Sequence, residues 1–283
     1  MFSNLSRDLT VEVPMLSSLS RGFTYFLAFL YAVLGFLLFF FHEQLAPVFA
    51  WKVTPFMTMT IGGWCIGNAW LARITARRWQ WSLVFSTLIY LWLFGLGELF
   101  VLFLFRDRIV LSHPIAWLYL ITLTVNVLAA LVGFLDWIRI RPRLAATYPE
   151  FNPGQLAATV AFILFVGFLG LYGSLAQIGA PGTNGGIFPE VMSLFTLRSF
   201  GMFYLTLALA VVPFLWYRSV NAILHHSLAS YGLIVFITAA AVVHIGLFDF
   251  AARPGGLLYF AAYLAVGIPL IFIFRKLGTG APL

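Results

Sequence analysis

The sequence predicts an all-α protein: a polytopic transmembrane helical bundle of about eight helices, built as two parallel four-helix repeats. Two observations indicate a membrane protein. Of the 283 residues, 62% are hydrophobic and only 9% are charged, and the mean hydropathy is +1.00. A soluble domain has about 25% charged and about 45–50% apolar residues. A water-facing surface cannot be built from so little charge, so lipid must surround most of this chain.

Apolar runs of membrane-spanning length occur repeatedly. A bilayer core of about 30 Å requires roughly 20 apolar residues in a helix. The segments that satisfy this are 22–42, 54–72, 80–105, 114–138, 154–178, 194–217, 229–248 and 256–274. Helix is the expected state, because unpaired backbone groups are too costly in lipid and the runs are too long for barrel strands.

Lys and Arg residues predict the orientation, because they favour the cytoplasmic side. One side carries Arg7, Arg21, Arg73, Arg77, Arg78, Arg139, Arg141, Arg143, Arg218, Arg275 and Lys276. The other side carries Lys52, Arg106, Arg108, Arg198 and Arg253. We therefore expect the protein to lie in the plasma or inner membrane, with both termini in the cytoplasm. The basic residues lie between spans rather than along one face, which argues against a nucleic-acid partner despite the net charge of +7.

The two halves of the chain resemble each other in the order of their short motifs. Leu34-Gly35 corresponds to Leu169-Gly170, and the stretch from Thr58 to Gly63 corresponds to that from Thr196 to Gly201. His113-Pro114 likewise corresponds to Arg253-Pro254. Since each unit has an even number of spans, the repeats share one orientation and a pseudo-two-fold axis along the membrane normal.

This organisation divides the chain into five parts. They are a cytoplasmic N-terminal segment (1–21), a first four-helix repeat (22–138), a cytoplasmic linker (139–153), a second four-helix repeat (154–275) and a cytoplasmic tail (276–283).

Ionisable residues within the spans are the strongest functional signal, since each costs roughly 2.5–3.5 kcal/mol on insertion scales unless it is paired. Glu98, Arg198 and His244 all fall in the outer half of the membrane. One interpretation is a polar pocket open to the outside, with Arg198 as a fixed positive charge and Glu98 with His244 as a proton relay or ligand-binding pair. The other is structural: Glu98 pairs with Arg198, and His244 donates to a backbone carbonyl.

Three more polar residues join these candidates. Asn68 and Asn126 either extend the pocket or form interhelical hydrogen bonds. Glu190, before the sixth span, either caps that helix at its positive end or acts as an outer gate.

Other chemistries find little support in the sequence. A bis-His haem is disfavoured because His244 alone lies within a span, although a single pigment or haem on His244 stays open. The adjacent His225 and His226 point about 100° apart on a helix, and we expect them in a solvated loop. The single Cys65 excludes an internal disulfide and a cysteine-based metal cluster. The sequence predicts no metal and no cofactor.

Three functional classes remain. The first is a structural or accessory subunit that packs with other membrane-protein subunits and with membrane lipids, favoured by the short loops and scarce intramembrane polar groups. The second is a carrier of a small molecule, with an outward-facing polar pocket between the repeats. The third is a quinone-linked or lipid-modifying enzyme, which is the weakest because nucleophile and base motifs are not recognisable.

Overall fold

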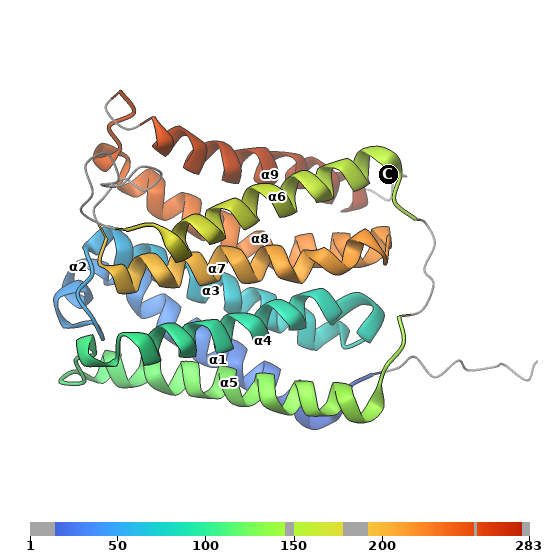
Figure 1. Ribbon diagram of the computed structural model, residues 1–283, viewed down its shortest axis with the longest axis horizontal. Coiled ribbons are helices and arrows are strands. Elements are labelled where there is room, and N and C mark those ends of the chain that lie inside the picture. Colours follow the sequence, from blue (N-terminus) through green and yellow to red (C-terminus); the bar gives the residue numbers. More distant parts are fainter. Residues whose placement is uncertain (1–14, 145–149, 178–191, 252–253, 279–283) are drawn as a thin grey trace, which may run out of the picture.

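The computed structural model describes residues 15–144, 150–177, 192–251 and 254–278, and these residues form an antiparallel bundle of long helices (Figure 1). The long helices are α1 (Ser18–Phe40), α3 (Pro55–Arg78), α4 (Trp81–Leu104), α5 (Pro114–Ile140), α6 (Pro153–Leu175), α7 (Leu194–Val211), α8 (Val220–Val243) and α9 (Gly255–Gly278). Short helices are α2 (His42–Leu45), η1 (Ala46–Val48), η2 (Arg106–Arg108), η3 (Val212–Leu215) and η4 (Ile245–Leu247). Within the described ranges there is no strand beyond an isolated bridge of Glu150 with Ser219, so the all-α prediction is confirmed.

Six of these helices are long and apolar enough to cross a membrane: α1, α4, α5, α6, α7 extended by η3, and α8. The chain is therefore a multi-pass membrane protein. Helices α3 and α9 are not among the six, and the count of eight spans stays a prediction. The composition of α3 fits its position, because most of its residues are buried against α1, α4 and α8 and need no lipid-compatible surface.

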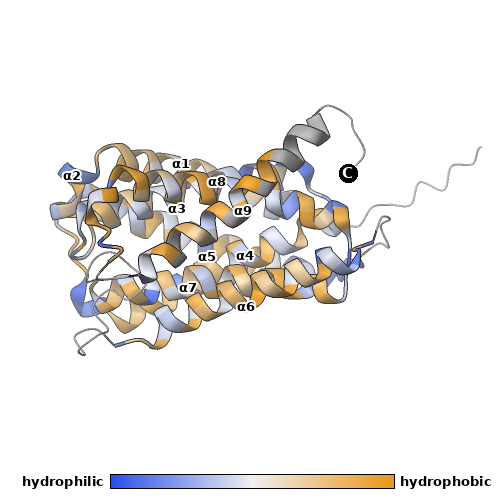
Figure 2. Ribbon diagram, turned by 90° about the horizontal axis from the view of Figure 1, so that it is seen from above, coloured by the Kyte–Doolittle hydropathy of each residue, from blue (hydrophilic) through white to orange (hydrophobic). Residues whose placement is uncertain are grey.

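The bundle has two polar ends and an apolar middle (Figure 2). At one end, which we call the basic end, α3 and α5 finish while α1, α4, α6 and α8 begin. Arg21 Nε donates there to the carbonyl of Ala76 at 2.8 Å, and Trp79 Nε1 donates to the carbonyl of Leu16 at 2.9 Å. The described chain places Arg73, Arg77, Arg78, Arg139, Arg141, Arg143 and Arg218 at or near this end. The side of the membrane that it faces stays a prediction.

Helix α1 starts at Ser18, four residues before the predicted span, because local polar groups cap it. The side chain of Ser17 accepts from the backbone N–H of Ser20. The carboxylate of Asp136, near the end of α5, accepts from the backbone N–H of Ser17 at 3.1 Å and from the hydroxyls of Ser17 and Ser20. A negative charge at a helix N-terminus is favourable, so Asp136 fastens the start of α1 to α5.

Helix α8 corrects two expectations. It begins at Val220, nine residues before the predicted span, because Ser219 caps it by accepting from the backbone N–H of Ala222. The helix therefore includes His225 and His226, which are only 9% and 4% exposed, and the prediction of a solvated loop is wrong.

The other end of α8 also differs from the prediction. The helix ends at Val243, so His244 is its C-cap residue rather than a residue inside the span. The chain then continues into the short helix η4.

Helices α1 and α3 cross at two glycines. A Cβ built on Gly35 would lie 2.6 Å from the backbone nitrogen of Ile66, and one built on Gly62 would meet the backbone of Phe39. Contacts this short leave no room for any side chain. The two backbones therefore approach each other as closely as glycine permits.

Helices α6 and α7 cross in the same way. A Cβ on Gly170 would lie 2.5 Å from the backbone nitrogen of Leu205, and one on Gly201 would lie 2.5 Å from that of Ser174. The residues of α6 lie 135 positions after their counterparts in α1 (170 against 35, 174 against 39). Those of α7 lie 139 positions after their counterparts in α3 (201 against 62, 205 against 66).

This spacing bears on the predicted alignment of the halves. It agrees with the pairing of Gly35 and Gly170, but it places Gly62 rather than Gly63 opposite Gly201, a shift of one residue. Two matching crossings are local observations, and the repeat of the whole four-helix unit stays a prediction.

Candidate functional site

A small internal cavity lies among α1, α3, α4 and α5. It offers about 40 Å³ to the centres of water molecules. Since one water needs about 10–15 Å³ by this measure, the cavity holds about three. Its walls are Tyr31, Leu34, Trp51, Ile61, Trp64, Cys65, Phe94, Glu98, Tyr119, Thr122, Leu123 and Ser199, the last from α7.

Glu98 is the ionisable residue of this cavity. It lies six residues before the end of α4 at Leu104, which is about 9 Å along the helix axis. Its side chain is 5% exposed. Phe94, one turn earlier on the same face, also lines the cavity. The hydrophobic residues of α4 thus carry a carboxyl group into the interior of the bundle.

Four polar atoms around the cavity have no hydrogen-bond partner among the described residues: Glu98 Oε1, Trp64 Nε1, the Tyr119 hydroxyl and the Ser199 hydroxyl. Ser199 lies near enough to interact with the carboxyl group of Glu98, but without the geometry of a hydrogen bond. Leaving a buried polar group unpartnered costs about 1–3 kcal/mol. All four groups belong to residues that line one small, mostly apolar space, which is large enough for a ligand or water molecules.

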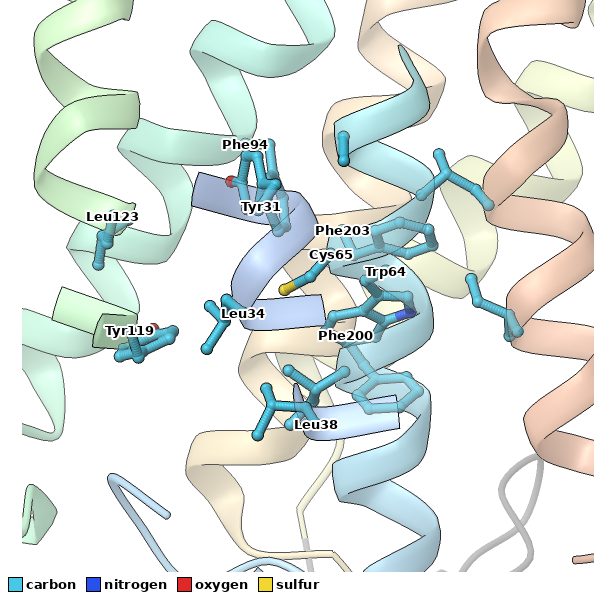
Figure 3. Packing of buried hydrophobic residues seen from close by; sticks show 14 of the residues in the cluster. Tyr31, Leu34, Leu38, Trp64, Cys65, Phe94, Tyr119, Leu123, Phe200 and Phe203 are labelled. Carbon is cyan, nitrogen blue, oxygen red and sulfur yellow. The ribbon is translucent and has the colours of Figure 1, made fainter. Parts of the chain in front are cut away.

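Aromatic rings hold the cavity walls in place. Trp64 stacks on Phe203, with ring centroids 4.8 Å apart and planes at 7°, and Phe200 meets its edge at 4.3 Å. Figure 3 shows this stack, with Cys65 pointing from α3 toward Leu34 of α1.

Trp51 closes the wall nearest the non-basic end, just before α3 begins. Its ring stacks on Phe195 at 4.2 Å and 14°. Its Nε1 donates to the hydroxyl of Thr196 at 3.0 Å. Trp51 is 3% exposed, so a ring fixed to α7 separates the cavity from that end of the bundle.

Arg198 does not line this cavity. Its Nη1 donates to the carbonyls of Gly173 and Ala176 at 2.9 and 2.8 Å. These carbonyls belong to the end of α6, where no further turn of helix is available to accept from. This contact takes the place of the Glu98–Arg198 pair that the sequence suggested, and among the described residues Glu98 forms no ion pair.

His244 also lies away from the cavity. Its Nδ1 is 3.2 Å from the carbonyl oxygen of Ala240, as in the structural interpretation of the sequence. Its ring packs against that of His42 from the segment after α1, with centroids 5.2 Å apart. Within the described ranges, no three His, Cys, Asp or Glu residues gather as a metal site.

Asn68 and Asn126 form interhelical hydrogen bonds and do not line the cavity. Asn68 Oδ1 accepts from the hydroxyl of Tyr90, which joins α3 to α4 at 2.9 Å. Asn126 Nδ2 donates to the hydroxyl of Tyr31 at 2.8 Å, which joins α5 to α1 and orients a residue of the cavity wall. Glu190, the predicted cap or gate, lies outside the described residues.

Sequence reasoning missed most of the cavity's polar groups. Trp64, Tyr119 and Ser199 were not singled out for a site. One signal was available: Trp64 is in the middle of its span, away from the membrane interface where Trp usually lies.

No protein-family model, curated protein or solved structure matches this chain. The class of protein therefore rests on the fold and the cavity alone. The chain is a multi-pass integral membrane protein with a small cavity inside its helical bundle, lined mostly by apolar side chains and by the carboxyl-bearing Glu98.

Proposed function

We propose that this protein is a membrane carrier that binds a small polar solute in the Glu98 cavity. The observation that carries the proposal is that four residues lining one space inside a helical bundle each have a buried polar atom without a partner among the described residues. A ligand that supplies their partners recovers the free energy lost when those groups left water.

The unpartnered atoms define the chemistry of the solute. Trp64 Nε1 can only donate, so the solute must carry an acceptor. Glu98 Oε1 can only accept when the carboxyl group is ionised, so a solute that binds this state must also carry a donor. Space for about three water molecules limits the solute to roughly three or four non-hydrogen atoms. A small neutral amide, such as acetamide, meets all three requirements.

The proposed site is formed mainly by the first four-helix unit (α1, α3, α4 and α5), and the second unit contributes Ser199 of α7. We propose that the second unit (α6 to α9) is its structural counterpart. At the shared spacing of 139 positions, Cys65 corresponds to Tyr204 and Glu98 corresponds to Ile237. The second unit thus has a bulkier ring and an apolar side chain at these two positions, which supports a single binding site at Glu98 rather than one in each unit.

We also propose Trp51 as the outer gate of the carrier. Its ring closes the cavity on the non-basic side, and it is fastened to α7 by one stacked ring and one hydrogen bond. Breaking these two contacts would open a path from Glu98 to that end of the bundle.

The other two functional classes have no observation of their own in their favour. Exposed apolar side chains such as Leu135 and Leu164 suit lipid as well as a neighbouring subunit. For the quinone-linked or lipid-modifying enzyme, the cavity offers a carboxyl group but only about three water volumes, which is too little for a quinone ring.

Uptake and binding of defined probes by the full-length protein test the proposal. Labelled acetamide carries a donor and an acceptor, methylammonium carries donors only, and acetate carries acceptors only. We expect acetamide to bind best, with a Kd of about 1 mM or weaker because so few atoms make contact. We also expect proteoliposomes to take it up.

Two variants make this test specific. Glu98→Met keeps the side-chain volume but removes the polar atoms, so binding and uptake should be lost while thermal stability holds or rises. Glu43→Gln changes an exposed carboxyl group after α1 and should behave as wild type. Equal acetamide binding by wild type and Glu98→Met, or no binding by either, would refute the proposal.

A further inference from the structure

A second buried polar cluster lies toward the basic end, where α4, α7 and α8 meet. Ser86 Oγ donates to the carbonyl of Ala210 at 2.6 Å, and the same oxygen is 2.9 Å from His226 Nδ1. A serine hydroxyl has one proton, and here it is directed at Ala210. The proton of the His226 ring must therefore lie on Nδ1, which leaves Nε2 as a bare acceptor.

Nε2 of His226 has no hydrogen-bond partner among the described residues, and the side chain is 4% exposed. The ring nitrogens of the adjacent His225 also have no hydrogen-bond partner among the described residues, but only the ring of His226 is held by Ser86 of α4. His226 holds one nitrogen in a fixed hydrogen bond and keeps the other free to receive a proton.

This cluster and the Glu98 cavity lie on one face of α4. Ser86, Tyr90, Phe94 and Glu98 follow one another at intervals of four residues, and all four are buried. Side chains at this spacing are neighbours along a helix surface. The twelve residues from Ser86 to Glu98 span about 18 Å along the axis.

The face between the two sites is polar except at one point. The Tyr90 hydroxyl donates to Asn68 Oδ1, and the amide nitrogen of Asn68 has no partner among the described residues. Phe94, stacked on Tyr90 at 5.7 Å and 15°, is the apolar interruption between Tyr90 and the cavity.

We infer that this face of α4 carries protons between Glu98 and His226, which makes the proposed carrier proton-coupled. The inference rests on the proposed function. One proton leaves the carboxyl group of Glu98, which becomes a carboxylate. It crosses on water molecules past Phe94 and the Tyr90 hydroxyl and binds Nε2 of neutral His226, which becomes an imidazolium. No electrons are exchanged, and the proton then leaves toward the basic end.

The groups around His226 are consistent with a transfer site. Ser86 faces it from α4, and the ring of Phe214 lies 6.3 Å from its ring. On its own helix the neighbours are His225, and Ser230, whose hydroxyl donates to the backbone carbonyl of His226. Arg78, at the end of α3, is close enough to act electrostatically on His225. None of these groups is a carboxylate, so no negative charge among them would trap the proton on His226.

The experiment uses the full-length protein in liposomes that contain a pH-sensitive dye. Labelled acetamide is added outside together with an inward pH gradient, and solute uptake and internal acidification are recorded together. In wild type we expect the two signals to rise together.

His226→Gln removes the proton acceptor from the path. It should slow acidification about tenfold or more, since positioned proton acceptors contribute factors of about 10²–10⁴ to proton-transfer steps. Acetamide binding in detergent should stay unchanged. The matched control is His225→Gln, a change at the adjacent buried histidine that makes no contact with Ser86, and it should acidify like wild type. Ser86→Ala, a smaller change, should slow acidification in part.

The outcomes separate this inference from the proposed function. Acetamide uptake by wild type without acidification, or wild-type acidification by His226→Gln and Ser86→Ala, overturns the proton path and leaves the carrier standing. Absence of both binding and uptake in wild type overturns the carrier and the proton path together.

Discussion

Trp64 of α3 and Phe203 of α7 stack almost in parallel, with ring centroids 4.8 Å apart and planes at 7°. The two residues are 139 positions apart, the same spacing that relates Gly62 to Gly201. Residues related by a two-fold axis meet each other when they lie beside that axis. The stack therefore supports the proposed pseudo-two-fold relation, and it fixes the Trp64 ring in the cavity wall.

The first prediction separates the stacking of Trp64 from its hydrogen-bonding role. Trp64→Phe keeps a ring against Phe203 but removes the only N–H donor of that side chain. Because a hydrogen bond contributes about 0.5–1.5 kcal/mol, the acetamide concentration for half-maximal uptake should rise about two- to tenfold. Trp92→Phe, a change at a mid-span Trp outside the cavity wall, is the control. An unchanged half-saturation value for Trp64→Phe would remove this residue from the site.

The second prediction concerns the glycine crossings. Gly62→Ala and Gly201→Ala place a methyl group against a neighbouring backbone and should lower the free energy of unfolding by about 1–3 kcal/mol. Gly22→Ala, on α1, meets nothing within 4 Å and should raise it by up to about 1 kcal/mol through helix propensity. Unfolding in detergent measures all three variants. Equal stability of Gly22→Ala and Gly201→Ala would contradict the close crossing.

The third prediction distinguishes a structural Arg198 from a binding residue. Arg198→Gln loses two charge-assisted hydrogen bonds to the end of α6. Thermal unfolding should therefore become easier, by about 2 kcal/mol. The affinity for acetamide should not change, since Arg198 does not border the cavity. Intact stability combined with weaker binding would instead return Arg198 to the site.

The fourth prediction tests the orientation in the membrane. In a Cys65→Ser background, Gln80→Cys places a thiol at the basic end and Asp107→Cys places one at the opposite end, both at exposed positions. A membrane-impermeant maleimide applied to intact cells should label only Asp107→Cys. Gln80→Cys should react after lysis. The reverse pattern would invert the predicted topology, in which the basic end faces the cytoplasm.

The sequence was informative about the elements and less so about their ends. Long apolar runs predicted each of the long helices, because length and apolar content are properties of a segment by itself. The start of α8 was missed by nine residues, since His225 and His226 looked like loop residues before their burial was known. The cap at Ser219 is a local signal for the start of α8, but the polar residues beside it favoured the interpretation as a loop.

The candidate site shows the same division. Glu98 stood out because a carboxyl group in a span is expensive. Its expected partners, Arg198 and His244, do not contact it. The guanidinium of Arg198 binds carbonyls at the end of α6, and His244 is bound to its own helix. Indole and hydroxyl groups such as those of Trp64 and Ser199 are ordinary in apolar helices, and only their place in the wall of one cavity singles them out.

By itself, then, the order of residues determined that lipid surrounds this chain, that it forms helices, and that its charges lie at the ends. These properties follow from the transfer of single segments between water and hydrocarbon. Tertiary structure decided which buried polar atoms share one space, because glycines far apart in the chain let helices approach closely enough to enclose it. Which atoms come together depends on how side chains of different helices pack against one another, and no single segment contains that information.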